Sequence, residues 1–324
     1  MTRSIAAIIF PVLLGILAGL AYAEDARQLP RIGLVFGSNP VITKPFDEVI
    51  REGLRSLGYV DGENVTILPR YAHGDPARFS ALISELIELK VDVLFLTGTA
   101  VPAAIQLTKT IPIVAVMGDA VREGFVASFA HPGGNITGGS VLAPETGSKR
   151  LELAMEVVPG LKHAVLMFET SDFRTSLANE FRTLARGFGV TVRLVGVRNL
   201  DEIEAALKAM KNDRPEALFL WSTPMMYEHG FRVIAASASY KVPVITDGRE
   251  FAAAGALLTY NANYTEMWRR SALYVDKILK GAKPGDLPIE QPTKFELVIN
   301  LKAARALGIT IPESILLRAD EVIR

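Results

Sequence analysis

The chain has 324 residues, enough for two domains of ordinary size. Apolar residues make up 49% of it, so it can bury large cores, and 35 basic residues balance 35 acidic ones. This balance argues against nucleic acid or an anionic surface as the main partner. Cysteine is absent, which excludes disulfides, thiol chemistry and a lipidated cysteine anchor.

The N-terminus, "MTRSIAAIIFPVLLGILAGLAYAED", has the pattern of a cleavable export signal. The cation Arg3 precedes an apolar run at 5–20, and Ala21-Tyr22-Ala23 forms a small-x-small site. A membrane anchor is the alternative, but the run is shorter than the roughly 20 residues of a spanning helix and contains Pro11. We predict cleavage after Ala23 and a periplasmic protein.

Strand-like and helix-like patterns alternate from Arg31 onward. Short continuous apolar strands between amphipathic helices indicate a parallel sheet covered on both faces. The predicted elements of the first half are a strand at 31–37, a helix at 45–57, a strand at 64–71, a helix with Phe79, Leu82, Ile83, Leu86 and Ile87 on one face, and strands at 91–96 and 111–116 with a helix between them.

The pattern restarts after residues 131–147, which are rich in glycine and proline. Within them, "GGNITGG" (133–139) lacks the spacing of a phosphate-binding loop and is interpreted as a turn. The second set comprises strands at 163–169, 190–197, 217–221 and 242–246, separated by helices. The similar order of elements predicts two similar α/β lobes, each with a doubly wound parallel sheet.

The tail is less regular. A strand is predicted at 255–261 and a helix at 264–280. A proline-punctuated connection (281–301) then ends in a strand, and a short helix ends at a Gly308 cap.

Several stretches resemble one known family, the bacterial ABC-transporter substrate-binding proteins that include the tryptophan- and tyrosine-binding ones. The resemblance covers residues 31–324. It is carried by "EGLRSLGYVDGENV" (52–65), "FVASFAHPGGNITG" (125–138) and "YVDKILKGAKPGDLPIEQPTKFELVINLKAARALGITIP" (274–312), among others.

This resemblance implies a type I periplasmic-binding fold, in which two lobes joined by three crossing strands close over a ligand. The crossings are expected near 139–144, 255–260 and 284–292. The N-terminal lobe would then comprise 31–142 plus 258–283, and the C-terminal lobe 143–257 plus 284–324. The implied function is that of a solute-binding component of an ABC importer, with an inner-membrane permease as its partner.

Ligands of open α/β sheets lie beyond the carboxyl ends of the strands. Thr97-Gly98-Thr99 follows the strand at 91–96, where hydroxyls, free backbone N–H groups and a helix terminus favour an anion. Gly98 would allow close approach of the ligand. We hypothesise that this loop holds a carboxylate; the alternative is a plain helix N-cap by Thr99.

Two further loops of the first lobe have equivalent positions. Ser38 and Asn39 follow the first strand and are candidate ligand contacts, or else part of a polar turn before Pro40. Asp119 follows the strand at 111–116 and could pair with an ammonium group, or else cap the next helix. Many family members have Gly-Asp-Pro here, whereas this chain has Ala120 in place of the proline.

In the second lobe the candidates at strand ends are Glu169, Ser171, Ser222, Thr223 and Asp247. A buried unpaired carboxylate is costly, so Asp247 or Glu169 facing the cleft would favour a cationic group. Helix capping is the alternative for Asp247 and Ser171. Two carboxylates together with an anion site would suit a zwitterionic amino acid, and only the family comparison suggests an aromatic one.

Aromatic walls of such a site are candidates as well. Phe36, Trp221 and Tyr260 lie in or beside strands, where aromatic residues more often belong to the core.

No catalytic arrangement is visible. The four histidines, at 73, 131, 163 and 229, form no metal-spaced pair, and neither a G-x-S-x-G motif nor a P-loop occurs. We therefore predict a monomeric binding protein without metal or cofactor. An exported α/β enzyme using Asp119 or Asp247, or a sensory ligand-binding module, is the alternative. Helices near Lys149–Arg150 and Arg269–Arg270 are candidate exposed surfaces for the permease, or else ordinary solvated helix faces.

Overall fold

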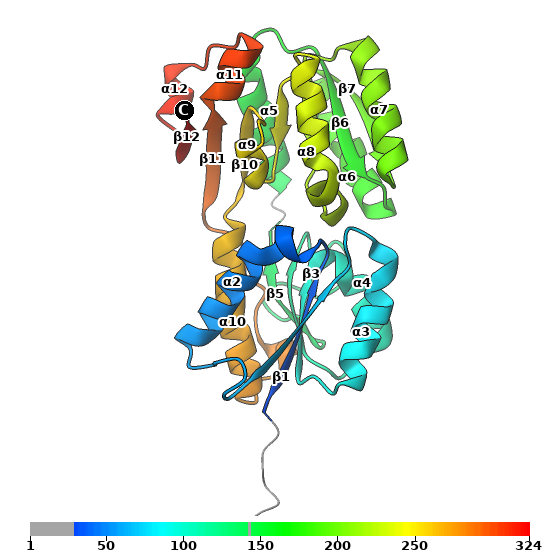
Figure 1. The fold of residues 1–324 in the computed structure, drawn as a ribbon, viewed down its shortest axis with the longest axis vertical. Coiled ribbons are helices and arrows are strands. Elements are labelled where there is room, and N and C mark those ends of the chain that lie inside the picture. The colour runs from blue at the N-terminus through cyan, green and yellow to red at the C-terminus, as the bar shows by residue number, and fades with distance from the viewer. Residues whose placement is uncertain (1–28, 142–143) are drawn as a thin grey trace, which may run out of the picture.

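The computed structural model describes residues 29–141 and 144–324, and the predicted export signal lies outside them. Two α/β lobes lie one above the other, with the chain passing between them on one side (Figure 1). Among the described residues, no helix is both long and apolar enough to cross a membrane.

The first lobe is built on a five-stranded sheet in the order β2-β1-β3-β4-β5, in which every pairing is parallel. Its strands are β1 (Arg31–Phe36), β2 (Thr66–Tyr71), β3 (Val93–Thr97), β4 (Ile113–Met117) and β5 (Ile136–Ser140). Its helices are α2 (Pro40–Ser56), α3 (Phe79–Glu88), α4 (Val101–Leu107) and α10 (Tyr264–Leu279), with 3-10 turns η1 (Pro76–Arg78), η2 (Gly98–Ala100) and η3 (Pro284–Asp286).

The second lobe has a seven-stranded sheet in the order β12-β11-β10-β9-β8-β6-β7, in which only the β10–β11 pairing is antiparallel. Its strands are β6 (His163–Glu169), β7 (Thr191–Val197), β8 (Ala217–Leu220), β9 (Val244–Thr246), β10 (Leu258–Ala262), β11 (Phe295–Asn300) and β12 (Glu321–Ile323). Its helices are α5 (Pro144–Val157), α6 (Asp172–Gly187), α7 (Leu200–Asp213), α8 (Pro224–Ser239), α9 (Glu250–Ala253), α11 (Leu301–Leu307) and α12 (Glu313–Leu316).

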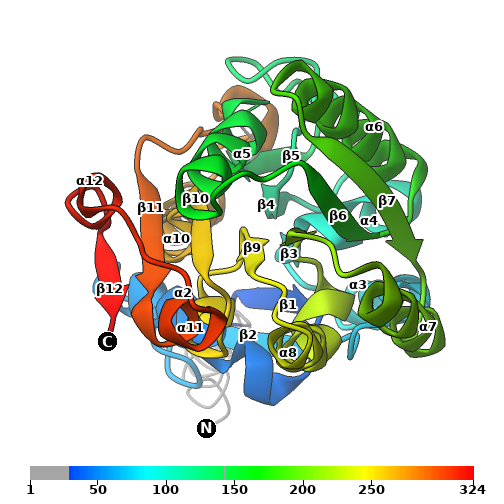
Figure 2. The same cartoon turned by 90° about the horizontal axis from the view of Figure 1, so that it is seen from above.

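Each sheet is buried on both faces, as the continuous apolar strands predict. In the first lobe, Ile50 of α2 and Trp268 of α10 pack on one face, and Ile83 of α3 and Val101 of α4 on the other. In the second lobe, α5 and α6 cover one face and α7 and α8 the other (Figure 2). The prediction of two similar doubly wound lobes is confirmed, since β7-β6-β8-β9-β10 repeats the strand order of the first sheet.

Strand pairing shows where the chain changes lobes. Residues 258–262 form β10 in the second sheet, so the second crossing follows this strand and leads into α10. Residues 285–290 lie beside the first lobe, where Ser140 N–H donates to the Glu290 carbonyl at 2.8 Å. Both segments therefore lie in the lobe opposite to the one that the family resemblance implied.

The glycine-rich stretch at 133–139 is not a turn throughout, because Ile136–Ser140 forms strand β5. Gly138 has φ +130°, and a Cβ there would lie 2.1 Å from the Ala115 carbonyl oxygen. A glycine is needed at this point because the neighbouring strand passes so close.

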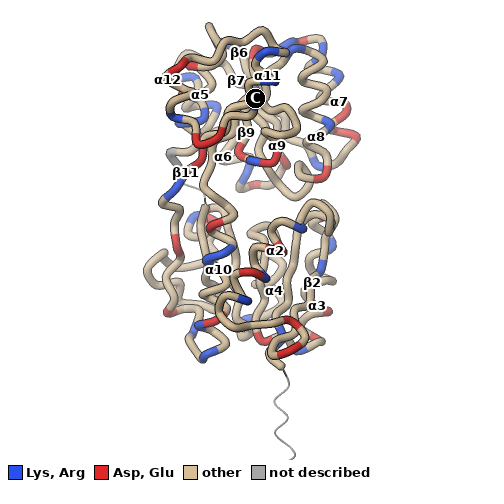
Figure 3. The backbone as a smooth tube through the Cα atoms, turned by 60° about the vertical axis from the view of Figure 1, so that its left-hand side comes forward, with Lys and Arg blue, Asp and Glu red and all other residues tan. Residues whose placement is uncertain are grey.

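Basic and acidic residues are interspersed over both lobes, and neither sign dominates one side in the view of Figure 3. This distribution agrees with the balanced composition. The described residues also contain no group of three or more histidine or acidic side chains that could hold a metal ion.

Candidate ligand-binding cleft

Each sheet has a switch point, where the connections from two adjacent strands lead to helices on opposite faces. In the order 2-1-3-4-5 it lies between the first and third strands, which are β1 and β3 in the first lobe and β6 and β8 in the second. The lobes contact each other through the loops and helix starts that follow strand carboxyl ends. The two switch points therefore face each other across a cleft.

At the end of β3 the structure places two hydroxyls together. Thr97 Oγ1 and Thr99 Oγ1 lie 3.5 Å apart. Thr99 lies inside η2, and the N-cap positions of η2 and α4 are Thr97 and Ala100, neither of which makes a side-chain cap hydrogen bond. Thr99 is thus no ordinary helix N-cap. Gly98 has a packing role, because a Cβ there would lie 2.8 Å from Met117 Cα.

Ser38 and Asn39, at the end of β1, contact the second lobe. Ser38 Oγ donates to the carbonyl of Pro224 at 3.0 Å. The backbone N–H and the Nδ2 group of Asn39 donate to the two oxygens of Glu228, both at 2.7 Å. Asn39 Oδ1 also caps α2 by accepting from the N–H groups of Val41 and Ile42. These bonds hold the first turns of α8 against the first lobe.

Two glycines make room for this contact. A Cβ on Gly37 would lie 2.4 Å from Pro224 Cγ, and a Cβ on Gly74 would lie 2.7 Å from Glu228 Cγ. Any larger side chain at these strand ends would meet α8. The lobes are therefore in a closed arrangement.

The loop after β4 contacts α6 of the second lobe. Arg122 forms a two-pronged ion pair with Glu180, and its guanidinium lies 5.8 Å from the centre of the Phe173 ring. Asp119 Oδ1 accepts from the Arg122 N–H at 3.0 Å, so Asp119 caps a turn and not a helix. This is a second bridge across the cleft.

Glu123 lies in the same loop and interacts electrostatically with Arg174 of α6. Burial raises the pKa of the Glu123 carboxyl to about 7, and the negative charge of Asp119 adds to the rise. The positive charge of Arg174 opposes that rise.

Asp247, at the end of β9, is paired within the second lobe. Its Oδ2 lies 3.2 Å from Arg150 Nη1, with both side chains mostly buried, and its Oδ1 accepts from the Ser222 N–H at 2.7 Å. Arg150 is only 7% exposed, so the prediction of an exposed permease surface there is wrong for this residue. Beside Asp247 and Tyr264 lies a hollow of about 20 Å³, enough for one water molecule.

Glu169 and Ser222 differ from these paired groups. Glu169 Oε2 and Ser222 Oγ are buried and have no hydrogen-bond partner among the described residues. Ser171 and Thr223, in contrast, are the N-caps of α6 and α8, accepting from the N–H groups of Arg174 and Met226.

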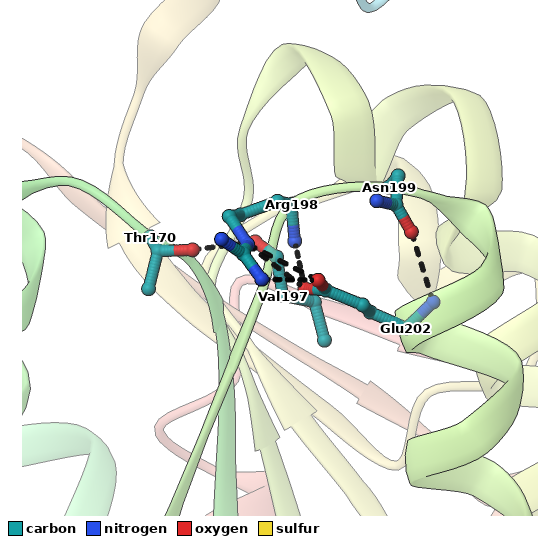
Figure 4. Close-up of polar contacts among 5 residues, drawn as sticks. All are labelled: Thr170, Val197, Arg198, Asn199 and Glu202. Carbon is teal, nitrogen blue, oxygen red and sulfur yellow. Dashed lines mark hydrogen bonds and ion pairs between the residues drawn. The ribbon is translucent and has the colours of Figure 1, made fainter.

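The adjacent end of β7 satisfies its own polar groups (Figure 4). Thr170 Oγ1 donates to the Val197 carbonyl at 3.1 Å, Arg198 pairs with Glu202, and Asn199 caps α7. These groups are partnered, unlike Glu169 Oε2 and Ser222 Oγ.

The aromatic candidates lie in different surroundings. Phe36 is 1% exposed in the first core, stacked on Tyr71 and Trp268. Trp221 packs on Phe168 at the edge of the second core. Tyr260 stacks on Phe295, beside the crossing segments.

Sequence reasoning missed several residues of the cleft. Tyr227 of α8 makes an edge contact with Phe46 of α2 across the cleft, and Tyr264 lies where the chain enters α10. Burial raises the pKa of both hydroxyls. The sequence offers no local signal for them, because both lie on helices whose apolar faces predict core packing.

A two-lobe α/β protein with two switch points facing one cleft has the architecture of a protein that encloses a small solute. The chain belongs to the ABC transporter substrate binding protein family, whose profile matches residues 38–323. It is a solute-binding component of an ABC transporter and not an enzyme.

Three relatives illustrate the similarity. A "tyrosine-binding protein" of Clostridioides difficile is 24% identical over 88% of this chain and 83% of its own length. An ABC domain from Streptococcus pneumonia in complex with L-Trp is 26% identical, covers 91% of this chain and 100% of that one, and has a TM-score of 0.84. A conserved domain protein from Vibrio cholerae has the same identity and coverage, with a TM-score of 0.85. The periplasmic-binding-protein fold is thus confirmed.

Proposed function

We propose that the ligand is an amino acid, held between the two switch points when the lobes close about their three crossings. The observation that carries this proposal is that polar groups of opposite character lie at the carboxyl ends of strands in the two lobes. The hydroxyls of Thr97 and Thr99 offer donors for a carboxylate, and the carboxylates at strand ends of the second lobe, Glu169 and Asp247, offer acceptors for an ammonium group. The tyrosine and tryptophan named for two relatives support an aromatic side chain.

Ligand entry requires the lobes to part. In the closed arrangement, Ser38 and Asn39 touch α8 and Arg122 touches α6. The hollow of about 20 Å³ beside Asp247 is far smaller than an amino acid. Closure around the ligand would then form these contacts, giving a shape that an inner-membrane permease can recognise. The protein would act as a monomer, exported to the periplasm with its signal removed after Ala23.

The test is calorimetry and thermal unfolding of refolded, ligand-stripped protein with single amino acids and with small carboxylic acids that lack an amino group. A ligand at about 100 times its dissociation constant should stabilise the native state by about 2.7 kcal/mol. We expect the largest shift with tryptophan, tyrosine or phenylalanine, and recovery of that ligand unchanged by mass spectrometry. Binding of amine-free acids alone would overturn the proposal.

Export is tested separately on the protein purified from its native cells. Mass spectrometry should find a mature N-terminus at Glu24, whereas an intact residue 1 would contradict cleavage. A gene for a permease and ATPase beside this one would favour transport over a sensory role.

A further inference from the structure

The end of β6 and the end of β8 present two unsatisfied polar atoms side by side. The strands pair in parallel with Met167 opposite Leu220, and the Trp221 N–H continues the ladder by donating to the Met167 carbonyl at 3.1 Å. Two residues further, this register places Glu169 opposite Ser222. Neighbouring strands lie about 4.8 Å apart, so one small ligand group can reach both side chains.

The buried carboxylate oxygen of this pair needs a hydrogen-bond donor, and the buried hydroxyl needs a hydrogen-bond partner. Glu169 Oε2 and Ser222 Oγ are shielded from solvent and unpartnered among the described residues. A buried carboxylate oxygen without a hydrogen bond is costly, and a charged donor is the partner that relieves this cost best. An ammonium group has three donors, enough to bond the carboxylate and the hydroxyl together.

The neighbouring carboxylate, Asp247, is already neutralised. Its Oδ2 pairs with Arg150 and its Oδ1 accepts from the Ser222 backbone. Asp247 therefore positions Ser222, while the charge of Arg150 makes this position unfavourable for a second cation.

Gly248, next to Asp247, lies close to the serine hydroxyl. A Cβ at Gly248 would lie 2.5 Å from Ser222 Oγ. Any side chain at this position would displace the Ser222 hydroxyl.

We propose that the ligand's ammonium group binds between Glu169 and Ser222, and that Asp247 acts as a positioning residue for Ser222. This inference rests on the proposed function, in which the ligand is an amino acid. It assigns the discrimination between an amino acid and its deaminated analogue to the second lobe.

The experiment compares matched ligands on matched variants. Calorimetry measures the binding of two amino acids and of their deaminated analogues. The pairs are L-tryptophan with indole-3-propionate and L-tyrosine with 3-(4-hydroxyphenyl)propionate. Each ligand is titrated into stripped wild-type, Glu169→Gln, Ser222→Ala and Glu204→Gln proteins. Glu204, exposed on α7, is the control. Loss of a charge-assisted hydrogen bond corresponds to a roughly ten- to hundredfold weaker affinity. Glu169→Gln should lose this much for the amino acid that binds and little for its analogue, Ser222→Ala less, and Glu204→Gln nothing.

The outcomes separate this inference from the proposed function. If the wild type binds an amino acid and Glu169→Gln binds it equally well, the ammonium site is wrong and the proposed function stands. Equal weakening of acid and amino acid would also overturn the ammonium site. If the wild type binds no amino acid, both fail. Should Glu169→Gln not fold, a crystal structure of the wild-type complex decides: an ammonium nitrogen on Asp247, away from Glu169, refutes the inference.

Discussion

Arg150 reaches the end of β9 from α5 and meets Asp247 there, with 9% and 16% of the two side chains exposed. Few charged groups are so deeply enclosed unless they are paired. Removing one partner leaves the other charge uncompensated, which costs more than the pair contributes. The pair is therefore a structural element of the second lobe, and its stability is testable without any ligand.

We predict that Asp247→Asn lowers the free energy of unfolding of the stripped protein by about 3 kcal/mol. Asparagine can still accept from the Ser222 N–H, so the loss reports mainly the unpaired Arg150. The double variant with Arg150→Met should recover part of the loss, because the buried charge is then gone. Urea denaturation of the two single variants and the double variant measures this.

The control is Glu202→Gln, which breaks the exposed pair with Arg198. Its effect should be much smaller, because solvent screens exposed charges. Purely additive losses in the double variant would show that Asp247 and Arg150 are not coupled.

The first turns of α8 pack against strand ends of the other lobe. This contact depends on where α8 begins and on the glycine at position 37. The helix begins where Thr223 caps it with its side chain, followed by Pro224 in the first turn. This fixes the position of Pro224 against Gly37. The same helix thus joins the second core and forms the closing contact.

We predict that Gly37→Ala prevents full closure without unfolding the lobes. Its Cβ would lie 2.4 Å from Pro224 Cγ, a clash that parting of the lobes relieves. Ligand affinity should fall at least tenfold, and the radius of gyration with saturating ligand should exceed that of the wild type by small-angle scattering. Gly134→Ala is the matched control, since nothing lies within 4 Å of its Cβ.

Thermal unfolding of the stripped Gly37→Ala protein should stay close to the wild type, because the clash arises only on closure. A variant that binds and compacts normally would show that the contact with α8 is not part of the bound state.

The sequence predicted most strands well, since a buried strand is a continuous apolar run whatever surrounds it. The first residues of helices were harder to predict. We predicted a helix from residue 45, but α2 begins at Pro40, because Asn39 caps it and proline suits the first helical position. Pro45 within the helix obscured this start. In β5, Gly138 and Gly139 suggest a turn, and only the close approach of β4 explains glycine there.

The candidate site was predictable only in part, for a related reason. Strand-end loops follow from the pattern, so the positions of Thr97, Glu169 and Ser222 at strand ends are predictable from sequence alone. Their partners are not, because Glu228 and Arg150 lie on helices far away in the chain. A sequence does not show which helix face meets which loop once two lobes close.

At the scale of the whole molecule, closure brings charged groups of both lobes together. Arg122 pairs with Glu180 at one side, and Asn39 binds Glu228 at the other. When the lobes close, ionisable groups move from open solvent into contacts between the lobes. Their pKa values change with these surroundings, so proton binding and closure are coupled.

The pKa of Glu123 determines the direction in which pH shifts the closure equilibrium. In the closed protein, burial raises the pKa of its carboxyl from its ordinary value of 4.5 to about 7. Because Arg174 of the other lobe is among the charges that act on Glu123, we expect opening of the lobes to expose the carboxyl to water and to return its pKa toward 4.5. A raised pKa in the closed form means that protonation favours closure. This contribution is full below about pH 4.5 and is lost as the pH rises through 7.

We predict that amino-acid affinity is roughly three- to tenfold higher at pH 5.5 than at pH 8, a range that allows for solvent screening of this partly exposed loop. An amino acid's own α-groups titrate outside this window. Glu123→Gln removes the Glu123 contribution, so its affinity should vary less with pH. Calorimetry of both proteins across this range measures the difference. Identical pH profiles would mean that Glu123 does not change its environment on closure.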